Sequence, residues 1–351
     1  MKKLVTLLSL VLALMLCLSV FSFASAEGGL KIGMAVREIT NDFNRGIISS
    51  AQNTIEALGG ELIVVDAQAD YQKHNENIEN LINSDVDGII IQLGDTQQLA
   101  PIVEKATEKG IPVVTAAIGA YVPGTLTDVN GDDALMAALA TDALLSSIDY
   151  TGDVYVTWVP GAPILETRKR VFEAICEAYP DITVHELPSE HNPAKTQTQI
   201  EELMTANPDE GSIAGIFAAY DSMMTGANEA IRRAGRGNDI AIVGIDGDMA
   251  TFQMIYAEDS PFVATCVQDS RDIGQRCIDY LLQAINGEIS VGDLPLKTAS
   301  ACYIATRRNG VAAAEAAWGE SVWEDTGLDK AAIEETYPQD TELLYTYPIV
   351  P

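Results

Sequence analysis

The residue types that most often carry catalysis or bind metal ions are few and widely spaced in this sequence. Its three histidines, His74, His185 and His191, are too scattered to indicate a metal cluster. The sequence contains no GxSxG nucleophile motif, no P-loop, no GxGxxG motif after a predicted strand and no HExxH motif. We therefore predict that the protein is not an enzyme and that it uses neither a metal nor a cofactor.

Cysteine chemistry is not indicated either. Cys17 lies inside an apolar N-terminal run, and four further cysteines are spread over the rest of the 351 residues. These four, Cys176, Cys266, Cys277 and Cys302, are too few for a disulfide scaffold, and none forms a CxxC pair. We expect buried free thiols. A single disulfide stays open, because the sequence does not pair them.

The N-terminus has the three parts of a secretory signal peptide. Residues 1–3 (MKK) are positively charged, residues 4–23 are apolar, and residues 24–26 (ASA) fit the small-x-small cleavage pattern. We predict that residues 1–26 are removed and that the protein is exported, to a periplasmic or extracellular location at the cell envelope. An uncleaved anchor and a lipoprotein attached at Cys17 are the alternatives. The bulky Leu16 before Cys17 disfavours the lipoprotein.

Length and charge limit the class of protein. A chain of 351 residues suits two α/β lobes, and 47% hydrophobic residues are enough for a core in each. The chain carries 51 acidic against 21 basic residues, a net charge of −30. Such a surface repels phosphate backbones and anionic lipid headgroups, so nucleic acid and membrane surfaces are excluded as expected partners.

Short β-branched runs alternate with amphipathic helical stretches along the chain. Strands are predicted at 31–36, 62–66, 88–93, 111–115, 153–159, 183–187, 214–218, 240–245 and 262–267. Helices are predicted at 44–58, 74–83, 99–109, 135–147, 168–178, 195–206, 223–234 and 271–286. This alternation, which starts again after about residue 132, predicts two doubly wound Rossmann-like lobes with parallel sheets and a ligand cleft between them.

Several short patterns, in a fixed order over residues 30–305, resemble the ribose- and galactose-type periplasmic binding proteins, the type 1 periplasmic-binding fold. They are TNDF (40–43), GGELIVVDAQAD (59–70), DGIII (87–91), GIPVV (110–114), Arg168 with VF (171–172), FAAYDSM (217–223), VGIDG (243–247) and VATCVQDSRDIG (263–274). Each pattern alone is weak, but the joint order is specific.

The resemblance implies a division of the chain. After the signal peptide, residues 27–130 plus 269–297 form an N-terminal lobe, and residues 131–268 plus 298–305 form a C-terminal lobe. The hinge crossings are expected near 129–132, 268–271 and 294–300. Residues 306–351 are an extension beyond the family pattern, with a helix at 311–318, and we expect it to pack on a lobe.

The resemblance also implies ligand-binding positions. Asn41 and Phe43 match an asparagine that binds hydroxyl groups and an aromatic that packs on a sugar face. Arg168 matches an arginine that spans two ligand oxygens, Asp246 an aspartate at a strand end, and Gln268 a glutamine in a hinge strand. Sugar rings combine apolar faces with hydroxyl edges, which such side chains suit.

The sequence also departs from the family pattern. Where relatives carry an Asp-Arg pair, this chain has Ala117 and Ile118. Tyr220 replaces an asparagine and His191 an aromatic, and Arg37 supplies a cation, so these three are further candidate ligand residues. The departures argue against ribose itself as the ligand. They leave the identity of the ligand open.

Each candidate also has a purely local interpretation. Asn41 can cap the following helix, and Phe43 can act as a hydrophobic staple. Asp246 can close an Asp-Gly turn. The remaining local alternatives are an ion pair of Arg168 with Glu166, an ion pair of Arg37 with Glu38 or Asp66, a hinge role for Gln268 and a core position for Trp158.

Together these observations predict an extracytoplasmic, monomeric solute-binding protein that captures a monosaccharide or similar small polar molecule for an ABC permease. A cationic or nucleoside-like ligand is the alternative, kept open by Glu166, Asp221 and Asp246. A partner that presents ligand to a membrane sensor is another. A transcription regulator of this fold would carry a DNA-binding helix pair ahead of Lys31, where this chain has the signal peptide.

Overall fold

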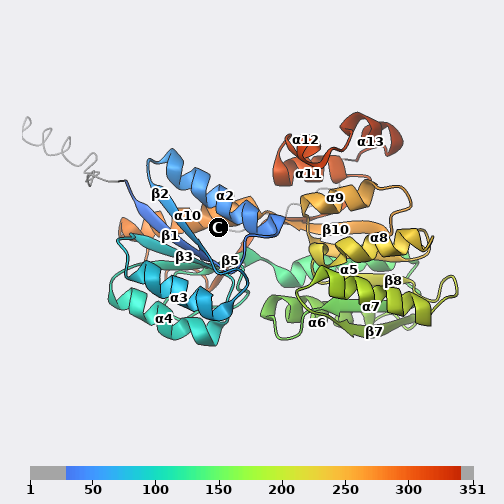
Figure 1. Ribbon diagram of the computed structural model, residues 1–351, viewed down its shortest axis with the longest axis horizontal. Coiled ribbons are helices and arrows are strands. Elements are labelled where there is room, and N and C mark those ends of the chain that lie inside the picture. Colours follow the sequence, from blue (N-terminus) through green and yellow to red (C-terminus); the bar gives the residue numbers. More distant parts are fainter. Residues whose placement is uncertain (1–28, 341–351) are drawn as a thin grey trace, which may run out of the picture.

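The computed structural model describes residues 29–340, and Figure 1 shows two α/β lobes side by side. The predicted fold class is confirmed: within the described residues each lobe is built on a sheet of six strands. The predicted signal peptide and the last part of the extension, residues 341–351, lie outside the described residues.

The first lobe has a parallel sheet in the strand order β11-β5-β4-β3-β1-β2. Its strands are β1 (Lys31–Val36), β2 (Glu61–Asp66), β3 (Gly88–Gln92), β4 (Val113–Ala116), β5 (Asp128–Gly131) and β11 (Lys297–Ser300). Its helices are α2 (Asp42–Ala57), α3 (Tyr71–Ile82), α4 (Thr96–Glu108) and α10 (Ser270–Ile285).

The second lobe has the strand order β12-β10-β9-β8-β6-β7, with β12 antiparallel to β10. Its strands are β6 (Gly152–Trp158), β7 (Ile182–Pro188), β8 (Gly215–Ala218), β9 (Ala241–Asp246), β10 (Phe262–Gln268) and β12 (Cys302–Thr306). Its helices are α5 (Asp133–Ser147), α6 (Pro163–Cys176), α7 (Pro193–Ala206), α8 (Thr225–Arg233) and α9 (Met249–Tyr256).

The periodicity of the sequence explains these elements. Ile47, Ala51 and Ile55 recur four residues apart in α2 and are fully buried against the sheet. The central strand β3 is buried at every position, as expected for a parallel strand covered by helices on both faces. The chain thus forms the two cores that its hydrophobic pattern predicts.

Three short connections join the lobes. They are Asp132 between β5 and α5, Asp269 between β10 and α10, and Ala301 between β11 and β12. The Asp269 amide donates to the Ala301 carbonyl over 3.2 Å, so two connections are hydrogen-bonded to each other. The third connection lies just beyond the predicted range 294–300, because β11 keeps these last residues in the first sheet.

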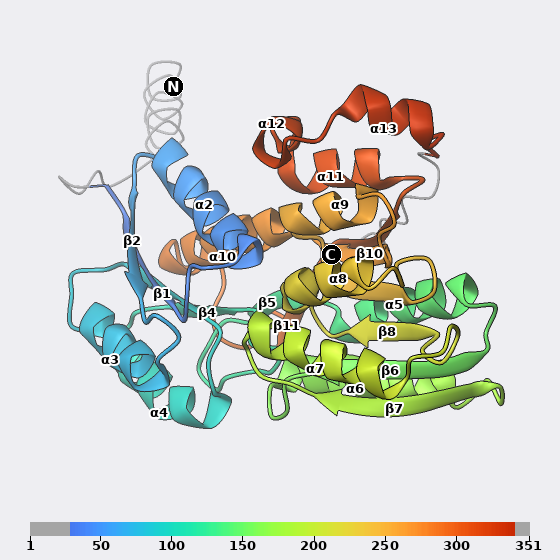
Figure 2. The same cartoon turned by 45° about the vertical axis from the view of Figure 1, so that its right-hand side comes forward.

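The C-terminal extension packs on the second lobe, near α9 (Figure 2). Its helices are α11 (Gly310–Trp318), α12 (Val322–Thr326) and α13 (Lys330–Thr336). Ala313, Ala314 and Val322 share a buried cluster with Phe252 and Val267 of the lobe. The predicted helix at 311–318 is confirmed, and the expectation that the extension packs on a lobe agrees with this cluster.

The four cysteines within residues 29–340 are free and buried, as expected. In the same part of the chain, the structure contains no helix that is both long enough and apolar enough to cross a bilayer.

Candidate ligand-binding site

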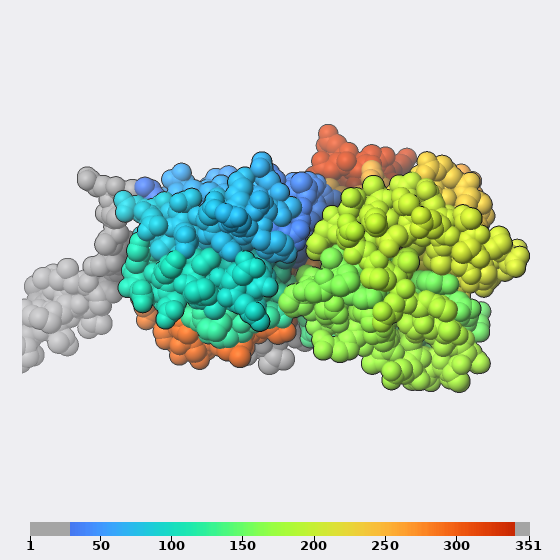
Figure 3. All heavy atoms as spheres, turned by 60° about the horizontal axis from the view of Figure 1, so that its bottom comes forward, coloured from blue at the N-terminus to red at the C-terminus, as the bar shows by residue number. Residues whose placement is uncertain are grey.

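A cavity of about 490 Å³ lies between the lobes, and residues of both lobes line it. Figure 3 shows the two lobes as separate masses that meet along a seam. All eight residues predicted for the site line this one cavity: Arg37, Asn41, Phe43, Arg168, His191, Tyr220, Asp246 and Gln268. The fold therefore brings together positions that are up to about 230 residues apart in the chain. Whether each of them contacts a ligand stays a prediction.

Arg168 is the central cation of the site and is only 1% exposed. It projects from α6, and its Nε donates to Asp133 Oδ1 over 2.9 Å. Its Nη1 donates to the Ala219 carbonyl over 2.7 Å and to Asp246 Oδ1 over 3.3 Å. Two carboxylates thus neutralise and orient the guanidinium group.

The alternative ion pair between Arg168 and Glu166 does not form. Glu166 Oε1 instead accepts hydrogen bonds from the Trp158 indole, over 3.2 Å, and from the Gly161 amide, over 2.9 Å. Trp158 is 5% exposed and belongs to the core of the second lobe, which confirms its predicted core position.

Asp246 is the last residue of β9 and has a φ of 131°, in the region that L-residues seldom adopt. Besides Arg168, Gln268 Nε2 donates to its Oδ1 over 2.7 Å. Burial raises the pKa of Asp246 to about 7, while the positive charge of Arg168 acts in the opposite direction. The side chain is held by the protein on one oxygen, which leaves Oδ2 for a hydroxyl donor.

Several buried polar atoms of the cavity-lining residues have no hydrogen-bond partner within residues 29–340. They are Nη2 of Arg168, Nε of Arg37, Oε1 of Gln268 and Oδ1 of Asn130. The first two are donors and the last two are acceptors. Buried polar atoms without partners are costly, so these four favour a ligand that both donates and accepts hydrogen bonds.

Asn41 and Phe43 lie at the start of α2 and have structural roles besides lining the cavity. Asn41 Oδ1 accepts from the Asn44 amide over 2.8 Å, so the helix-cap interpretation is confirmed. The side-chain amide nitrogen of Asn41 is not used in this cap. Phe43 packs partly against the core of the first lobe and leaves the rest of its ring to the cavity.

Arg37, His191 and Tyr220 form one side of the cavity. Arg37 Nη2 lies 3.2 Å from Glu38 Oε1, the predicted local ion pair, and its guanidinium lies 5.2 Å from the Tyr71 ring centroid. The rings of His191 and Tyr220 lie 5.9 Å apart with a tilt of 34°. Arg37 comes from the first lobe and the two rings from the second, so lobe movement would change this wall.

The missing Asp-Arg pair leaves an apolar wall. Ala117 and Ile118 line the cavity together with Ile164 and Leu165 of the second lobe. A Cβ built on Gly119 would lie 2.2 Å from Cγ2 of Ile164, so the backbone of the first lobe lies directly against a side chain of the second. The cavity therefore has a polar side and an apolar side.

Sequence reasoning missed several polar or aromatic residues at or beside the cavity, among them Asp133, Asn130 and Tyr71. Asp133 holds Arg168, Asn130 hydrogen-bonds Asp133 over 2.9 Å, and Tyr71 covers Arg37. Asn130 and Asp133 flank a crossing that was predicted near 129–132, so their polar types at a strand end were the available signal. Asp133 follows Asp132, which caps α5, and the sequence does not say which of the two points inward.

The lobes also contact each other beside the cavity. Asp42 Oδ2, at the start of α2, accepts from the Met249 amide at the start of α9, over 3.1 Å. The carboxylate of Asp248 is 4% exposed, and burial raises its pKa well above the ordinary value, while the nearby Phe43 amide acts in the opposite direction. The N-terminus of α9 in the second lobe thus lies beside Asp42 of the first lobe, and the N-terminus of α2 in the first lobe lies beside Asp248 of the second.

Within residues 29–340, no three histidine, cysteine or acidic side chains lie close enough together to hold a metal ion.

Comparison with known protein families shows to which family the chain belongs. The model of the periplasmic binding protein domain matches residues 32–289. The chain belongs to the periplasmic binding protein family. The members of this family are solute-binding proteins rather than enzymes, in agreement with the prediction from the sequence motifs. The match ends at residue 289, so the extension with α11, α12 and α13 lies outside it.

Individual relatives agree with the ribose- and galactose-type resemblance. A ribose import binding protein of Bacillus subtilis is 28% identical to this periplasmic binding protein over 258 residues, 73% of this chain and 82% of the relative. An ABC sugar transporter subunit from Rhodobacter sphaeroides has a TM-score of 0.72 at 25% identity, covering 80% of this chain and 99% of that one. A 5-methylthioribose transporter solute binding protein from Thermotoga lettingae has a TM-score of 0.72 at 25% identity, covering 86% and 97%.

Behind the site of this periplasmic binding protein, Asp221 is completely buried. Its Oδ2 accepts from the Gly247 amide and from the hydroxyl groups of Thr251 and Thr265, over 2.7–2.9 Å. Burial raises the pKa of Asp221 to about 6, although these hydrogen bonds lower it. Because the folded protein holds this proton more tightly than the unfolded chain, ionisation of Asp221 costs stability as the pH rises through about 6.

We expect Asp221→Asn to remove this cost. We compare the free energy of unfolding of the variant with that of wild type at two pH values. The difference, variant minus wild type, should be about 2 kcal/mol larger at about pH 7.5 than at about pH 4.5. Urea denaturation at the two pH values measures the difference, with the exposed Asp85→Asn as control. A stability difference between Asp221→Asn and wild type that does not change with pH would contradict the assignment.

Proposed function

We propose that this protein captures a sugar or a sugar-like small molecule outside the cytoplasm and delivers it to an ABC importer by closing its lobes. Export through the predicted signal peptide, action as a monomer and docking on a membrane permease belong to this proposal. The observation that carries it is a cavity between the lobes that is lined by four residues with a buried donor or acceptor lacking a hydrogen-bond partner within residues 29–340.

The chemistry of the cavity favours a neutral polyhydroxylated ligand. Its donors and acceptors occur together, as hydroxyl groups require, and the rings of Phe43 and Tyr220 can pack on apolar C–H faces. Asp133 and Asp246 both contact Arg168, and Glu38 is paired with Arg37, so each of these three carboxylates already has a cationic partner and is a weaker attraction for a cationic ligand. The relatives named for ribose and 5-methylthioribose support the same class.

Closure provides the mechanism. A ligand that touches both walls binds the closed lobes better than the open ones and therefore shifts the equilibrium toward closure. The short connections at Asp132, Asp269 and Ala301 provide the hinge. A permease would then distinguish the closed surface from the open one.

A thermal-shift screen of residues 27–351 against pentoses, hexoses, polyols, nucleosides and basic amino acids tests the proposal. A ligand that binds only the folded form at about 100 times its Kd adds about 2.7 kcal/mol to the free energy of unfolding and raises the melting temperature. We expect a pentose, hexose or polyol to do this, and small-angle scattering with that compound to show compaction. If only basic amino acids or nucleosides raise the melting temperature, the sugar proposal is wrong.

The variant Asn41→Asp tests whether Asn41 contacts the ligand. An aspartate keeps the oxygen that caps α2 but loses the amide that donates to a ligand, so the fold is preserved. We expect an unchanged melting temperature without ligand and a weaker shift with the sugar that stabilises the wild type. An equal shift in both proteins would remove Asn41 from the site.

A further inference from the structure

The C-terminal extension contacts both lobes, although the chain enters it from the second lobe. One link is Trp318, at the end of α11, whose Nε1 donates to the Gly247 carbonyl of the second lobe over 2.8 Å. The same indole reaches the first lobe: a Cβ built on Gly46 of α2 would lie 3.5 Å from its Cη2. Arg271 of α10 adds a second link, since its Nη2 donates to the Ala316 carbonyl over 2.5 Å.

The carbonyl that Trp318 holds belongs to the backbone beside the ligand site. Gly247 directly follows Asp246, and both residues have positive φ angles, 75° and 131°. A non-glycine residue in such a conformation persists only where its surroundings hold it. The Gly247 amide is held by Asp221 and its carbonyl by Trp318, so both polar groups of this residue are fixed.

Beside this turn lies one of the hydrogen bonds that join the lobes. The Met249 amide, two residues after Gly247, donates to Asp42 of the first lobe. Trp318 therefore bonds the turn that follows Asp246 and lies near α2 at Gly46. The lobe contact at Met249 is two residues along the chain from the carbonyl that Trp318 holds. Because an indole is rigid and closely packed, a shift of the turn at Gly247 would move the indole against α2.

We propose that Trp318 is a positioning residue for the ligand site: it fixes the turn after Asp246 and, with Arg271, fastens the first lobe to the second through the extension. The extension then acts as part of the hinge and sets how readily the lobes separate. This role rests on the ligand site proposed above, but its test uses no ligand, so the two proposals fail separately.

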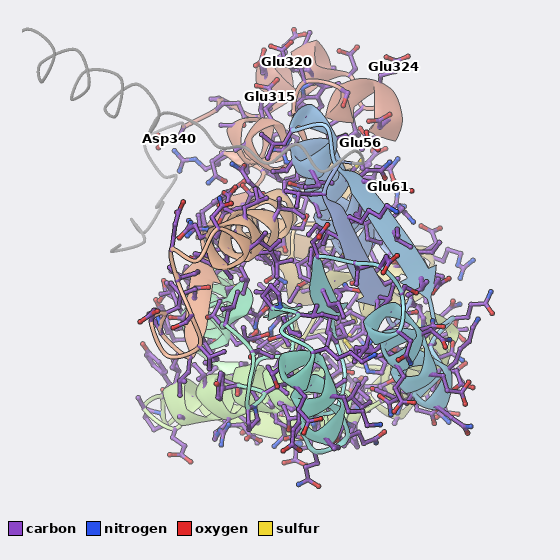
Figure 4. The ribbon with its side chains drawn as sticks, turned by 90° about the vertical axis from the view of Figure 1, so that its left-hand side faces the viewer. Glu56, Glu61, Glu315, Glu320, Glu324 and Asp340 are labelled. Carbon is purple, nitrogen blue, oxygen red and sulfur yellow. The ribbon has the colours of Figure 1, made fainter. Side chains whose placement is uncertain are left out.

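Other side chains of the extension serve for comparison. Glu320 and Glu324 are exposed on it and point away from the lobes (Figure 4). Trp323 Nε1 donates to Glu315 Oε1 over 2.8 Å, a hydrogen bond that stays within the extension. Trp323 thus has an indole hydrogen bond of the same length without an acceptor on either lobe, which makes it a matched control.

The test compares Trp318→Phe with Trp323→Phe by hydrogen exchange of individual amides in the absence of ligand. Phenylalanine keeps an aromatic ring, although a smaller one than indole, and removes the N–H donor in both variants. We expect the Met249 amide to exchange at least about tenfold faster in Trp318→Phe than in Trp323→Phe, because the turn that carries it is released. Equal exchange of Met249 in the two variants would overturn the proposal.

A distance measurement tests the fastening of the lobes. Spin labels on Asn53→Cys in α2 and Glu202→Cys in α7 lie on exposed positions of different lobes. We expect Trp318→Phe to add a population at longer distances, which Trp323→Phe lacks. Identical distance distributions in the two variants would show that the extension does not hold the lobes.

Arg271→Met provides a second route should Trp318→Phe fail to fold. It removes the link to Ala316 from the first lobe and leaves the extension unchanged in sequence. We expect the same added population at longer distances. An unchanged distance distribution in Arg271→Met would contradict the proposal independently.

Discussion

Arg168→Met is expected to abolish the thermal shift that a sugar causes and to lower the free energy of unfolding by about 3–5 kcal/mol at neutral pH. Methionine fills much of the space of the arginine side chain but leaves Asp133 and Asp246 without their cation. Two buried carboxylates would then face each other's charge in a low dielectric. The Ala219 carbonyl would also lose its donor.

The pH dependence of this loss identifies its cause. Unpaired buried carboxylates bind protons more tightly than those of the unfolded chain, so the destabilisation by Arg168→Met should decrease as the pH falls toward about 5. Urea denaturation measures the free energy, and Arg170→Met, an exposed position two residues along the same helix, is the control. A loss that is equal at both pH values would indicate a packing defect instead of unpaired charge.

Gly274→Ala is expected to lower the free energy of unfolding by about 3 kcal/mol, the upper part of the range for overpacked cores. A Cβ at residue 274 of α10 would lie 2.3 Å from the Ile47 carbonyl oxygen and 2.9 Å from the Ala51 nitrogen, both in the backbone of α2. Backbone atoms cannot rotate away as the end of a side chain can, so α2 and α10 would have to move apart. The shift would also move the start of α2, which carries Asn41 and Phe43.

Gly226→Ala is the matched control. Gly226 is also a helical glycine, but the nearest atoms to its added Cβ belong to the side chain of Gln197, and the closest of them, Oε1, can turn away. Alanine has a helix propensity about 1 kcal/mol better than glycine, so this variant should be unchanged or slightly stabilised. Comparable losses in Gly226→Ala and Gly274→Ala, measured by urea denaturation, would refute the close-approach explanation.

The architecture could be predicted because hydrophobic residues recur along the sequence at spacings that are typical of helices and strands. The runs that became β1, β3, β6 and β9 are long and β-branched, and α11 was recognisable from its alanines. Strand β5 (DVNG) was not predicted as a strand, because its hydrophobic content is low and its pairing with β4 and β11 decides its conformation. Helix α9 was missed for a related reason, since it is short and packs against the extension.

The site was predictable only where the family pattern marks a position. Arg168 and Asp246 were both expected, yet the sequence did not reveal that they pair with each other and with Asp133. Such a network depends on which side of each strand end faces the cavity, and neighbouring aspartates such as Asp132 and Asp133 look alike in sequence. The role of Trp318 was not predictable either, because its partners Gly46 and Gly247 lie in distant segments.

The order in which the strands join the sheets has a consequence for biogenesis. Strand β5 pairs with β11, Asp128 lying opposite Lys297, and β10 pairs with β12 close to the end of the fold. During synthesis, neither sheet can be completed before residue 300 or so has left the ribosome. The nascent chain therefore stays incompletely folded for most of its translation, the condition in which a polypeptide can still be threaded through a translocation pore.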